Sequence, residues 1–96
     1  MIERRAGALR SLLFAPANHA RRREKAFECG ADAVVLDLED AVPPGEKAEA
    51  RRAVAALLAV PRAGQAWARI NGVDTPWSWA DLDALVLAGL DGIVVP

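Results

Sequence analysis

The stretch Ala33-Val34-Val35-Leu36-Asp37-Leu38-Glu39-Asp40 combines an apolar, partly β-branched run with three carboxylates at its carboxyl end. Such a run favours a buried β-strand, because valine side chains pack well on a pleated surface. In α/β proteins, the carboxyl ends of the strands are where the loops build binding sites. Like charges this close repel one another, so the cluster needs a cationic partner. Arg69, at the end of a later apolar run, is one candidate, and a divalent metal ion is another.

The rest of the chain alternates between strand-like and helix-like segments. We expect strands over residues 12–15, 33–38, 65–71 and 92–95, and helices over residues 19–29, 46–59 and 78–88. Asn18 is placed to cap the first helix, and Gly30 is placed to end it. Ser78 and Asp81 have the spacing of a capping box at the start of the third helix.

This βαβαβαβ order predicts an α/β fold with three right-handed crossovers and a parallel sheet of four strands. No helix follows the fourth strand within the 96 residues, which would leave part of the sheet without cover. An open four-stranded domain and the N-terminal portion of a (β/α)8 barrel, the TIM barrel, both fit the pattern. The barrel is favoured, because a complete barrel needs about 250 residues. Residues 1–96 would then form a partial barrel domain.

The composition is that of an ordinary globular protein. Hydrophobic residues make up 53% of the chain and the formal net charge is −1, which gives no support for nucleic-acid binding. The single cysteine, Cys29, fits a reducing compartment. The sequence has no N-terminal apolar stretch of signal-peptide length, and no run near the roughly 20 apolar residues of a membrane span. We therefore expect a soluble, cytoplasmic protein without a membrane partner.

Side-chain alternation predicts how the end of the second strand is arranged. Asp37 and Glu39 should point to one face of the sheet, with Leu36 and Leu38 toward the other. In a barrel, the two leucines would pack under the helices. Asp37 would then point into the mouth of the barrel.

By the same alternation, Trp67, Arg69 and Asn71 should share one face of the third strand. An Arg69 guanidinium beside Asp37 would form a charged surface at this edge of the sheet. The planar guanidinium can bind a carboxylate through two hydrogen bonds. A structural ion-pair network is the alternative, and the spacing alone leaves both open. Three acidic residues facing one arginine leave an excess of negative charge, which suits a metal ion.

The start of the first predicted helix is a second candidate site. Free backbone N–H groups and the helix dipole favour an anion there. Arg21 and Lys25, one turn apart, would extend that attraction to a phosphate-rich ligand. On composition alone, a solvated helix face is the simpler interpretation of these two residues. His19 has no cysteine or histidine partner at metal-binding spacing.

Several segments, taken in order, resemble a known family over nearly the whole chain. They are Arg10–Pro16, Glu24–Ala26, Gly30–Val42, Lys47, Ala50–Arg51, Arg69–Asn71, Thr75–Trp77 and Asp91–Pro96. The run from Leu36 to Val42 is highly specific. Together the segments resemble the citrate lyase β-subunit-like enzymes of the HpcH/HpaI aldolase/citrate lyase superfamily.

The resemblance implies a TIM-type barrel and a carbon–carbon lyase. Enzymes of this family cleave or form the C–C bond of β-hydroxyacyl-CoA thioesters of the citryl-, malyl- or citramalyl-CoA type. The products are an acyl-CoA and a keto acid such as oxaloacetate or glyoxylate. The resemblance further implies Mg²⁺ as the cofactor, which stabilises the developing enolate, and a homo-oligomer, either a trimer or a hexamer.

The resemblance also implies roles for individual residues. Arg69 matches the family's substrate-binding arginine, which would clamp the keto-acid carboxylate. Asp37 would be the catalytic residue that takes part directly. Glu39 and Asp40 would organise the outer shell of the metal ion, and Lys47 would neutralise part of this acidic cluster.

Other implied contacts lie outside the acidic cluster. Arg21 and Lys25 would contact the phosphates of CoA. The family's direct metal ligands, a glutamate and an aspartate on later strands, would fall beyond Pro96, so residues 1–96 are expected to lack them and to show no lyase turnover alone. Two other functions stay open. One is a truncated, non-catalytic α/β module that binds a partner, and the other is a related aldolase or thioesterase that uses Asp37 and Arg69.

Overall fold

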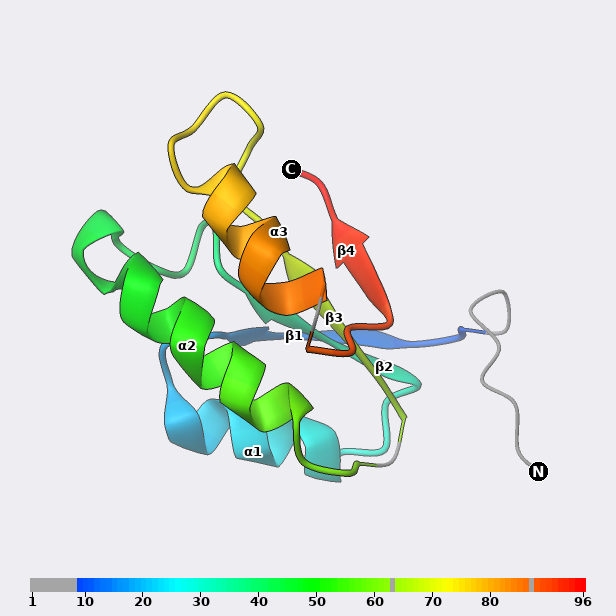
Figure 1. Cartoon of the computed structure of the whole chain (residues 1–96). Coiled ribbons are helices and arrows are strands. Elements are labelled where there is room, and N and C mark those ends of the chain that lie inside the picture. Colours follow the sequence, from blue (N-terminus) through cyan, green and yellow to red (C-terminus); the bar gives the residue numbers. More distant parts are fainter. Residues whose placement is uncertain (1–8, 63, 87) are drawn as a thin grey trace.

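The computed structural model of the chain describes residues 9–62, 64–86 and 88–96. Within them, strands and helices alternate along the chain (Figure 1). The elements are β1 (Leu12–Pro16), α1 (Ala20–Glu28), β2 (Ala33–Asp37), the short 3-10 helix η2 (Pro44–Glu46), α2 (Lys47–Leu58), β3 (Gln65–Arg69), α3 (Ser78–Val86) and β4 (Gly92–Val94). The predicted βαβαβαβ order is confirmed.

The strands of the described residues form one parallel sheet in the order β1-β2-β3-β4. A single cluster of buried apolar side chains joins the sheet to all three α-helices, through Ala26 of α1, Val54 of α2 and Leu85 of α3. The α-helices therefore lie on the same face of the sheet (Figure 1). A doubly wound sheet carries helices on both faces, whereas strands in chain order with helices on one face are typical of a (β/α)8 barrel. The prediction of successive βα units of a TIM-type barrel is confirmed.

The alternation predicted for β2 is present. Val34, Leu36 and Leu38 belong to the helix-side core, with at most 2% of their surface exposed. Val35 and Asp37, at the alternate positions, face the other way. All residues of β2 are buried, because β1 and β3 flank the strand on both sides.

Two predicted helix caps are wrong. His19 rather than Asn18 occupies the N-cap position of α1, and its side chain makes no capping hydrogen bond. The Asn18 amide Nδ2 instead donates a hydrogen bond to Oε1 of Glu46 at 2.8 Å. Ser78 is the first residue of α3, and the Asp81 carboxylate accepts hydrogen bonds from α2 and from the segment after β3 instead of forming a capping box. Asn18 and Asp81 thus bond to residues distant in sequence, which local spacing does not reveal.

No helix in the described part of the chain has the length and apolar character needed to cross a membrane. Residues 1–8, on which the expectation about a signal peptide rests, lie outside the described residues.

β4 begins at a glycine for a steric reason. Gly92 is the register partner of Trp67 on β3. A Cβ atom on Gly92 would lie 2.6 Å from Cε3 of the Trp67 ring. The ring is held in place by its Nε1, which donates a hydrogen bond to Oε1 of Gln65 at 2.8 Å. Only glycine leaves room for this ring across the β3–β4 pair.

We predict that Gly92→Ala lowers the free energy of unfolding by about 1–3 kcal/mol, because the Trp67 ring must shift or the strand pair must open. Thermal or denaturant unfolding of the full-length gene product measures the effect. Gly45→Ala is the matched control, since nothing lies within 4 Å of the place where its Cβ would be. Equal stability of the two variants would show that the Trp67 ring does not constrain Gly92.

Candidate functional site

Asp37 and Arg69 meet at the carboxyl edge of the sheet. They are register partners at the last positions of β2 and β3. Arg69 Nε donates a hydrogen bond to Asp37 Oδ1 at 3.0 Å, and Arg69 Nη2 donates one to Asp37 Oδ2 at 2.6 Å. The two side chains therefore converge on one face of the sheet, as the alternation predicts.

This pair fixes the charge of both groups. Burial raises the pKa of the Asp37 carboxyl, but hydrogen bonds from Arg69 and from the backbone N–H groups of Glu39 and Ala41, together with the charge of Arg69, outweigh it and leave that pKa below its ordinary value. The hydrogen bond to Asp37 raises the pKa of Arg69 against a lowering by burial, and the charges of Asp37, Glu39 and Asp40 add to the rise. Both members of the pair are therefore ionised at neutral pH.

The Arg69 guanidinium keeps hydrogen-bond donors to spare. A guanidinium has five N–H donors, and the pair with Asp37 occupies Nε and one N–H of Nη2. The outer edge, formed by Nη1 and the second N–H of Nη2, has the two-point geometry that fits another carboxylate. The Phe14 ring centroid lies 5.3 Å from Arg69 Cζ, a cation–π distance. Arg69 can thus bind an anionic ligand while it stays paired with Asp37.

The other two acids of the cluster lie in the loop after β2. Glu39 is partly exposed, and its Oε1 lies 3.7 Å from Arg69 Nε. Asp40 is exposed. The backbone N–H of Glu39 donates to Asp37 Oδ1 at 2.9 Å, which turns the loop back over the end of the strand. The loop that borders the Arg69 guanidinium is therefore acidic.

Lys47 supports this acidic loop from the start of α2. Its Nζ donates hydrogen bonds to the backbone carbonyls of Leu38 and Glu39, at 2.9 and 3.0 Å. The same Nζ lies 5.1 Å from the centroid of the Trp77 ring, a cation–π distance. Lys47 reaches the acidic cluster, but these hydrogen bonds hold the main chain of the loop rather than a carboxylate.

The predicted phosphate contacts, Arg21 and Lys25, are exposed on α1. The basic residue that lines the groove beside Asp37 is Arg22, together with His19, in a volume of about 310 Å³. Lys25 lines an adjoining groove, again with Arg22. The sequence does not single out Arg22, because the rotation of α1 about its axis decides which member of a run of arginines faces a groove.

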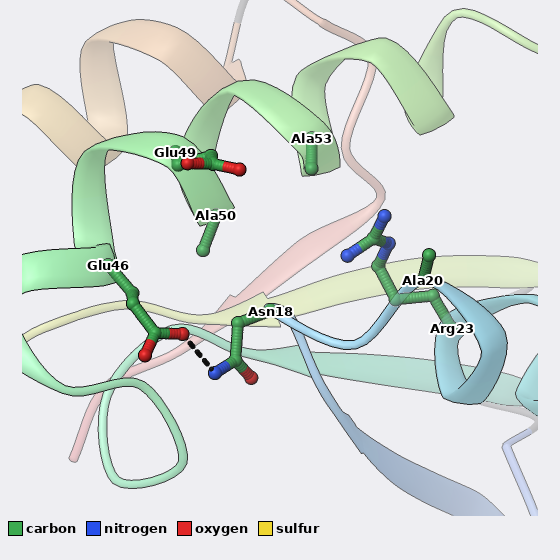
Figure 2. Close-up of a pocket in the computed structure, with 7 residues that line it drawn as sticks. All are labelled: Asn18, Ala20, Arg23, Glu46, Glu49, Ala50 and Ala53. Carbon is green, nitrogen blue, oxygen red and sulfur yellow. Dashed lines mark hydrogen bonds between the residues drawn. The ribbon is translucent and has the colours of Figure 1, made fainter.

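A different groove, of about 350 Å³, lies between α1 and α2 (Figure 2). Its lining residues are Asn18, Ala20, Arg23, Glu46, Glu49, Ala50 and Ala53. Two of its polar groups bond within the protein, since Arg23 donates to the Ala17 carbonyl and Asn18 donates to Glu46. Ala50 belongs to the helix-side core, so this groove lies on the opposite side of the sheet from the outer edge of Arg69.

Three polar residues that the sequence pattern does not connect lie beside the strand end that carries Arg69. Asn71 donates its backbone N–H and its Nδ2 to Asp81 Oδ2, at 3.0 and 2.7 Å, and Arg51 Nε donates to Asp81 Oδ1 at 2.9 Å. The prediction that Asn71 shares the face of Arg69 is wrong, because β3 ends at Arg69 and Asn71 turns toward α3. An acidic residue on the inward face of a largely apolar helix was the signal that could have revealed this group.

The described residues contain no group of three or more His, Cys, Asp or Glu side chains placed to hold a metal ion. Asp37 is engaged by Arg69, which leaves Glu39 and Asp40 as the carboxylates at the rim. Mg²⁺ demands octahedral oxygen coordination and keeps several of its waters. Glu39 and Asp40 therefore do not supply a full set of direct ligands, but they suit hydrogen bonds to metal-bound water.

Residues 10–96 match the family model described as HpcH/HpaI aldolase/citrate lyase. A (3S)-malyl-CoA thioesterase of Cereibacter sphaeroides is 43% identical over 89 residues, which cover 91% of this chain and 31% of the relative. The citrate lyase subunit beta of Escherichia coli is 38% identical over 96 residues, which cover 98% of this chain and 32% of the relative.

A solved structure, the citrate lyase beta subunit from M. tuberculosis complexed with oxaloacetate and magnesium, is 35% identical. It superposes with a TM-score of 0.72 over 93% of this chain and 39% of that chain. The chain spans about a third of the length of the curated relatives it matches.

We predict that Asp37→Asn lowers the free energy of unfolding by about 1–3 kcal/mol at neutral pH, because the amide keeps the shape but loses the charge that pairs with Arg69. The pKa of Asp37 is lowered on folding. Its contribution is therefore complete above the ordinary carboxyl pKa of about 3.9, and is lost as the pH falls through the lower folded value.

Denaturant unfolding of wild type and variant at a series of pH values tests this. The difference between them should be constant near neutral pH and shrink below about pH 4. Asp83→Asn, at an exposed position of α3, is the control and should change stability little at any pH. A wild-type advantage that persists unchanged into strong acid would contradict an ionised Asp37 in the folded protein.

Proposed function

The chain belongs to the HpcH/HpaI aldolase/citrate lyase family, and from this premise we propose that the protein is a magnesium-dependent carbon–carbon lyase. Its substrate would be a β-hydroxyacyl-CoA thioester of the citryl-, malyl- or citramalyl-CoA type. Cleavage of that substrate gives an acyl-CoA and a keto acid such as oxaloacetate or glyoxylate. The relatives named above support a CoA-linked reaction in one case and citrate lyase chemistry in the other.

The observation that carries the proposal is the outer edge of Arg69. Every keto acid of this reaction class carries a carboxylate beside its carbonyl carbon. A planar guanidinium with two donors in line binds such a carboxylate at two points, which fixes its rotation as well as its distance. Arg69 is already held by Asp37, so little conformational freedom is lost when the ligand binds.

We assign Asp37 the task of orienting this guanidinium. Both of its carboxylate oxygens accept hydrogen bonds from Arg69, and Oδ1 also accepts one from the backbone of Glu39. These bonds favour the ionised form, so Asp37 is poorly placed to give a proton near neutral pH. Its contribution to the reaction is then the direction and charge of Arg69 rather than the direct participation that the resemblance implies.

Glu39 and Asp40 would hold the outer shell of Mg²⁺ through its bound water, as their place at the rim suits. When it is bound, Mg²⁺ acts as a Lewis acid toward the keto-acid oxygens and stabilises the enolate oxygen. Lys47 keeps the loop that carries both acids in position through the carbonyls of Leu38 and Glu39.

For the CoA portion, we propose Arg21 and Lys25 on α1 as phosphate contacts. Both are exposed, and they lie four residues apart on one side of the helix. Arg22 lines the groove that connects this region with Asp37, and it extends the basic surface toward the reacting end. The predicted homo-oligomer, a trimer or a hexamer, stays a prediction.

A thioesterase is the second candidate, because a relative with 43% identity carries that name. The two reactions give different products: C–C cleavage gives a keto acid and an acyl-CoA, whereas thioester hydrolysis gives a hydroxy acid and free CoA. The test is to incubate the full-length gene product with citryl-, malyl- and citramalyl-CoA, with and without Mg²⁺. The products then show which of the two reactions occurs. Free CoA as the only CoA product would overturn the lyase proposal.

We predict that Arg69→Ala lowers kcat/KM about a hundredfold, mainly through a higher KM for the keto acid in the condensation direction, because the two-point contact is lost. Arg69→Lys keeps the charge without the fork and should fall between wild type and Arg69→Ala. Arg62→Ala is the control, since Arg62 pairs with Asp91 just before β4, at the opposite edge of the sheet. Keto-acid KM values near wild type in Arg69→Ala would show that the carboxylate clamp is misassigned.

We further predict that the double variant Arg21→Ala/Lys25→Ala raises the KM for the CoA thioester several-fold and leaves the keto-acid KM unchanged. The effect should shrink at high salt, because exposed charges are screened. Arg52→Ala, an exposed arginine on α2, controls for the loss of surface charge. If Arg52→Ala has the same effect, the contact is a general charge effect rather than a site.

A further inference from the structure

The backbone around Arg69 is held on three sides. The backbone N–H of Leu38, the residue after β2, donates to the Arg69 carbonyl at 3.0 Å, and the Ile70 N–H donates to the Val94 carbonyl of β4 at 3.1 Å. On the helix side, Asn71 donates both its backbone N–H and its side-chain amide to the Asp81 carboxylate. Two strands and one helix therefore fix the chain on either side of the guanidinium-bearing residue.

Burying the Asp81 carboxylate has a cost in folding free energy that an apolar side chain would not have. Only 1% of its surface is exposed, and a carboxylate removed from water is expensive unless partners replace that water. Arg51 supplies the opposite charge, and Asn71 supplies two N–H groups. An apolar side chain at this inward position of α3 would fill the core without that cost. The carboxylate adds two hydrogen bonds that hold Asn71, just after Arg69 in the chain.

The same end of α3 is also connected to the acidic loop. The Trp77 carbonyl accepts the backbone N–H of Asp81 at 3.0 Å, and the Trp77 ring lies against the Lys47 ammonium. Lys47 in turn holds the carbonyl of Glu39. The start of α3 is therefore joined to both halves of the site, to the strand end that carries Arg69 and to the loop that carries the acids.

We propose that Asp81 is a positioning residue for Arg69. By fixing Asn71, two residues farther along the chain, Asp81 sets the direction in which Arg69 presents its outer edge to the keto-acid carboxylate. The proposal rests on the function proposed above. Two-point recognition weakens steeply when the donor plane tilts or shifts, so in the condensation direction a loosened strand end affects the keto acid and not the acyl-CoA.

The test is Asp81→Asn in the full-length gene product. The amide keeps the size of the side chain but cannot pair with both Arg51 and Asn71 as the carboxylate does. We expect the KM for glyoxylate or oxaloacetate to rise about tenfold, with the KM for the acyl-CoA unchanged and kcat changed less. The dissociation constant of oxaloacetate, from calorimetry with excess Mg²⁺, should rise in parallel.

Asp91→Asn is the matched control. Asp91 also holds a strand backbone, since its Oδ2 accepts the Ala66 N–H at 2.8 Å and lies 3.4 Å from Arg62 Nη2, but it does so at the opposite edge of the sheet. This variant should lose stability and keep its keto-acid KM. If Asp81→Asn only loses stability in the same way, or if both variants raise the keto-acid KM equally, the positioning role is overturned.

A milder variant covers the case in which Asp81→Asn does not fold. Arg51→Lys keeps the charge next to Asp81 but replaces the directed Nε donor, and it should show the same selective rise in keto-acid KM at a smaller size. An unchanged KM in a folded Arg51→Lys protein counts against the proposal.

Arg69→Ala distinguishes a failure of the positioning role from a failure of the proposed function. If Arg69→Ala raises the keto-acid KM and the Asp81 and Arg51 variants do not, only the positioning role fails. If Arg69→Ala does not raise it, the proposed function fails with it.

Discussion

The register of β2 against β3 is the constraint on which the site depends, because it places Asp37 directly opposite Arg69. Side chains alternate along a strand, so a slip of one residue would turn one partner of the pair into the helix-side core and leave an unpaired charge there. The apolar residues of the same strands oppose such a slip. Leu36 of β2 and Ala68 of β3 are register partners, and both are buried in the helix-side core. The core thus selects the register, and the register creates the ion pair.

α2 contributes to the site and to the core with one face. Lys47 and Arg51 are four residues apart, so they lie on the same side of the helix, and each holds one half of the site. The next two residues on that side, Val54 and Leu58, are buried in the apolar core. The helix is therefore polar on its inward face near the carboxyl edge of the sheet and apolar farther away. This gradient places the buried Lys47 against the loop after β2 and the partly buried Arg51 against Asp81 of α3, at the end of the sheet where a barrel binds its ligands.

Sequence patterns predicted what depends on periodicity and missed what depends on partners. The strands, the helices and the meeting of Asp37 with Arg69 follow from a period of two in strands and from apolar spacing in helices. Alternation failed at Asn71, because it holds only while strand pairing continues and β3 ends two residues earlier. Asn18 and Asp81 were assigned to local caps, yet their partners lie 28 residues ahead and 30 residues behind them in the chain. Local spacing carries no information about such partners, whereas the fold decides them.

The charges around Arg69 bear on whether this guanidinium alone could bind an anionic ligand. The charges of Asp37, Glu39 and Asp40 all act on Arg69, while Lys47 contacts the same loop through main-chain carbonyls and Arg22 lines the groove beside Asp37. Under the proposed function, a keto-acid carboxylate would add a negative charge beside Glu39 and Asp40, and like charges at close range oppose its binding. In that role Arg69 would supply direction and two hydrogen bonds, but only one positive charge. A divalent cation at this rim would offset the acidic side chains, and the similar M. tuberculosis citrate lyase beta subunit is complexed with both oxaloacetate and magnesium. If the proposed function holds, the charges of Glu39 and Asp40 would oppose the substrate carboxylate in the absence of the metal ion, so that anion binding at Arg69 would strengthen when the cation is bound.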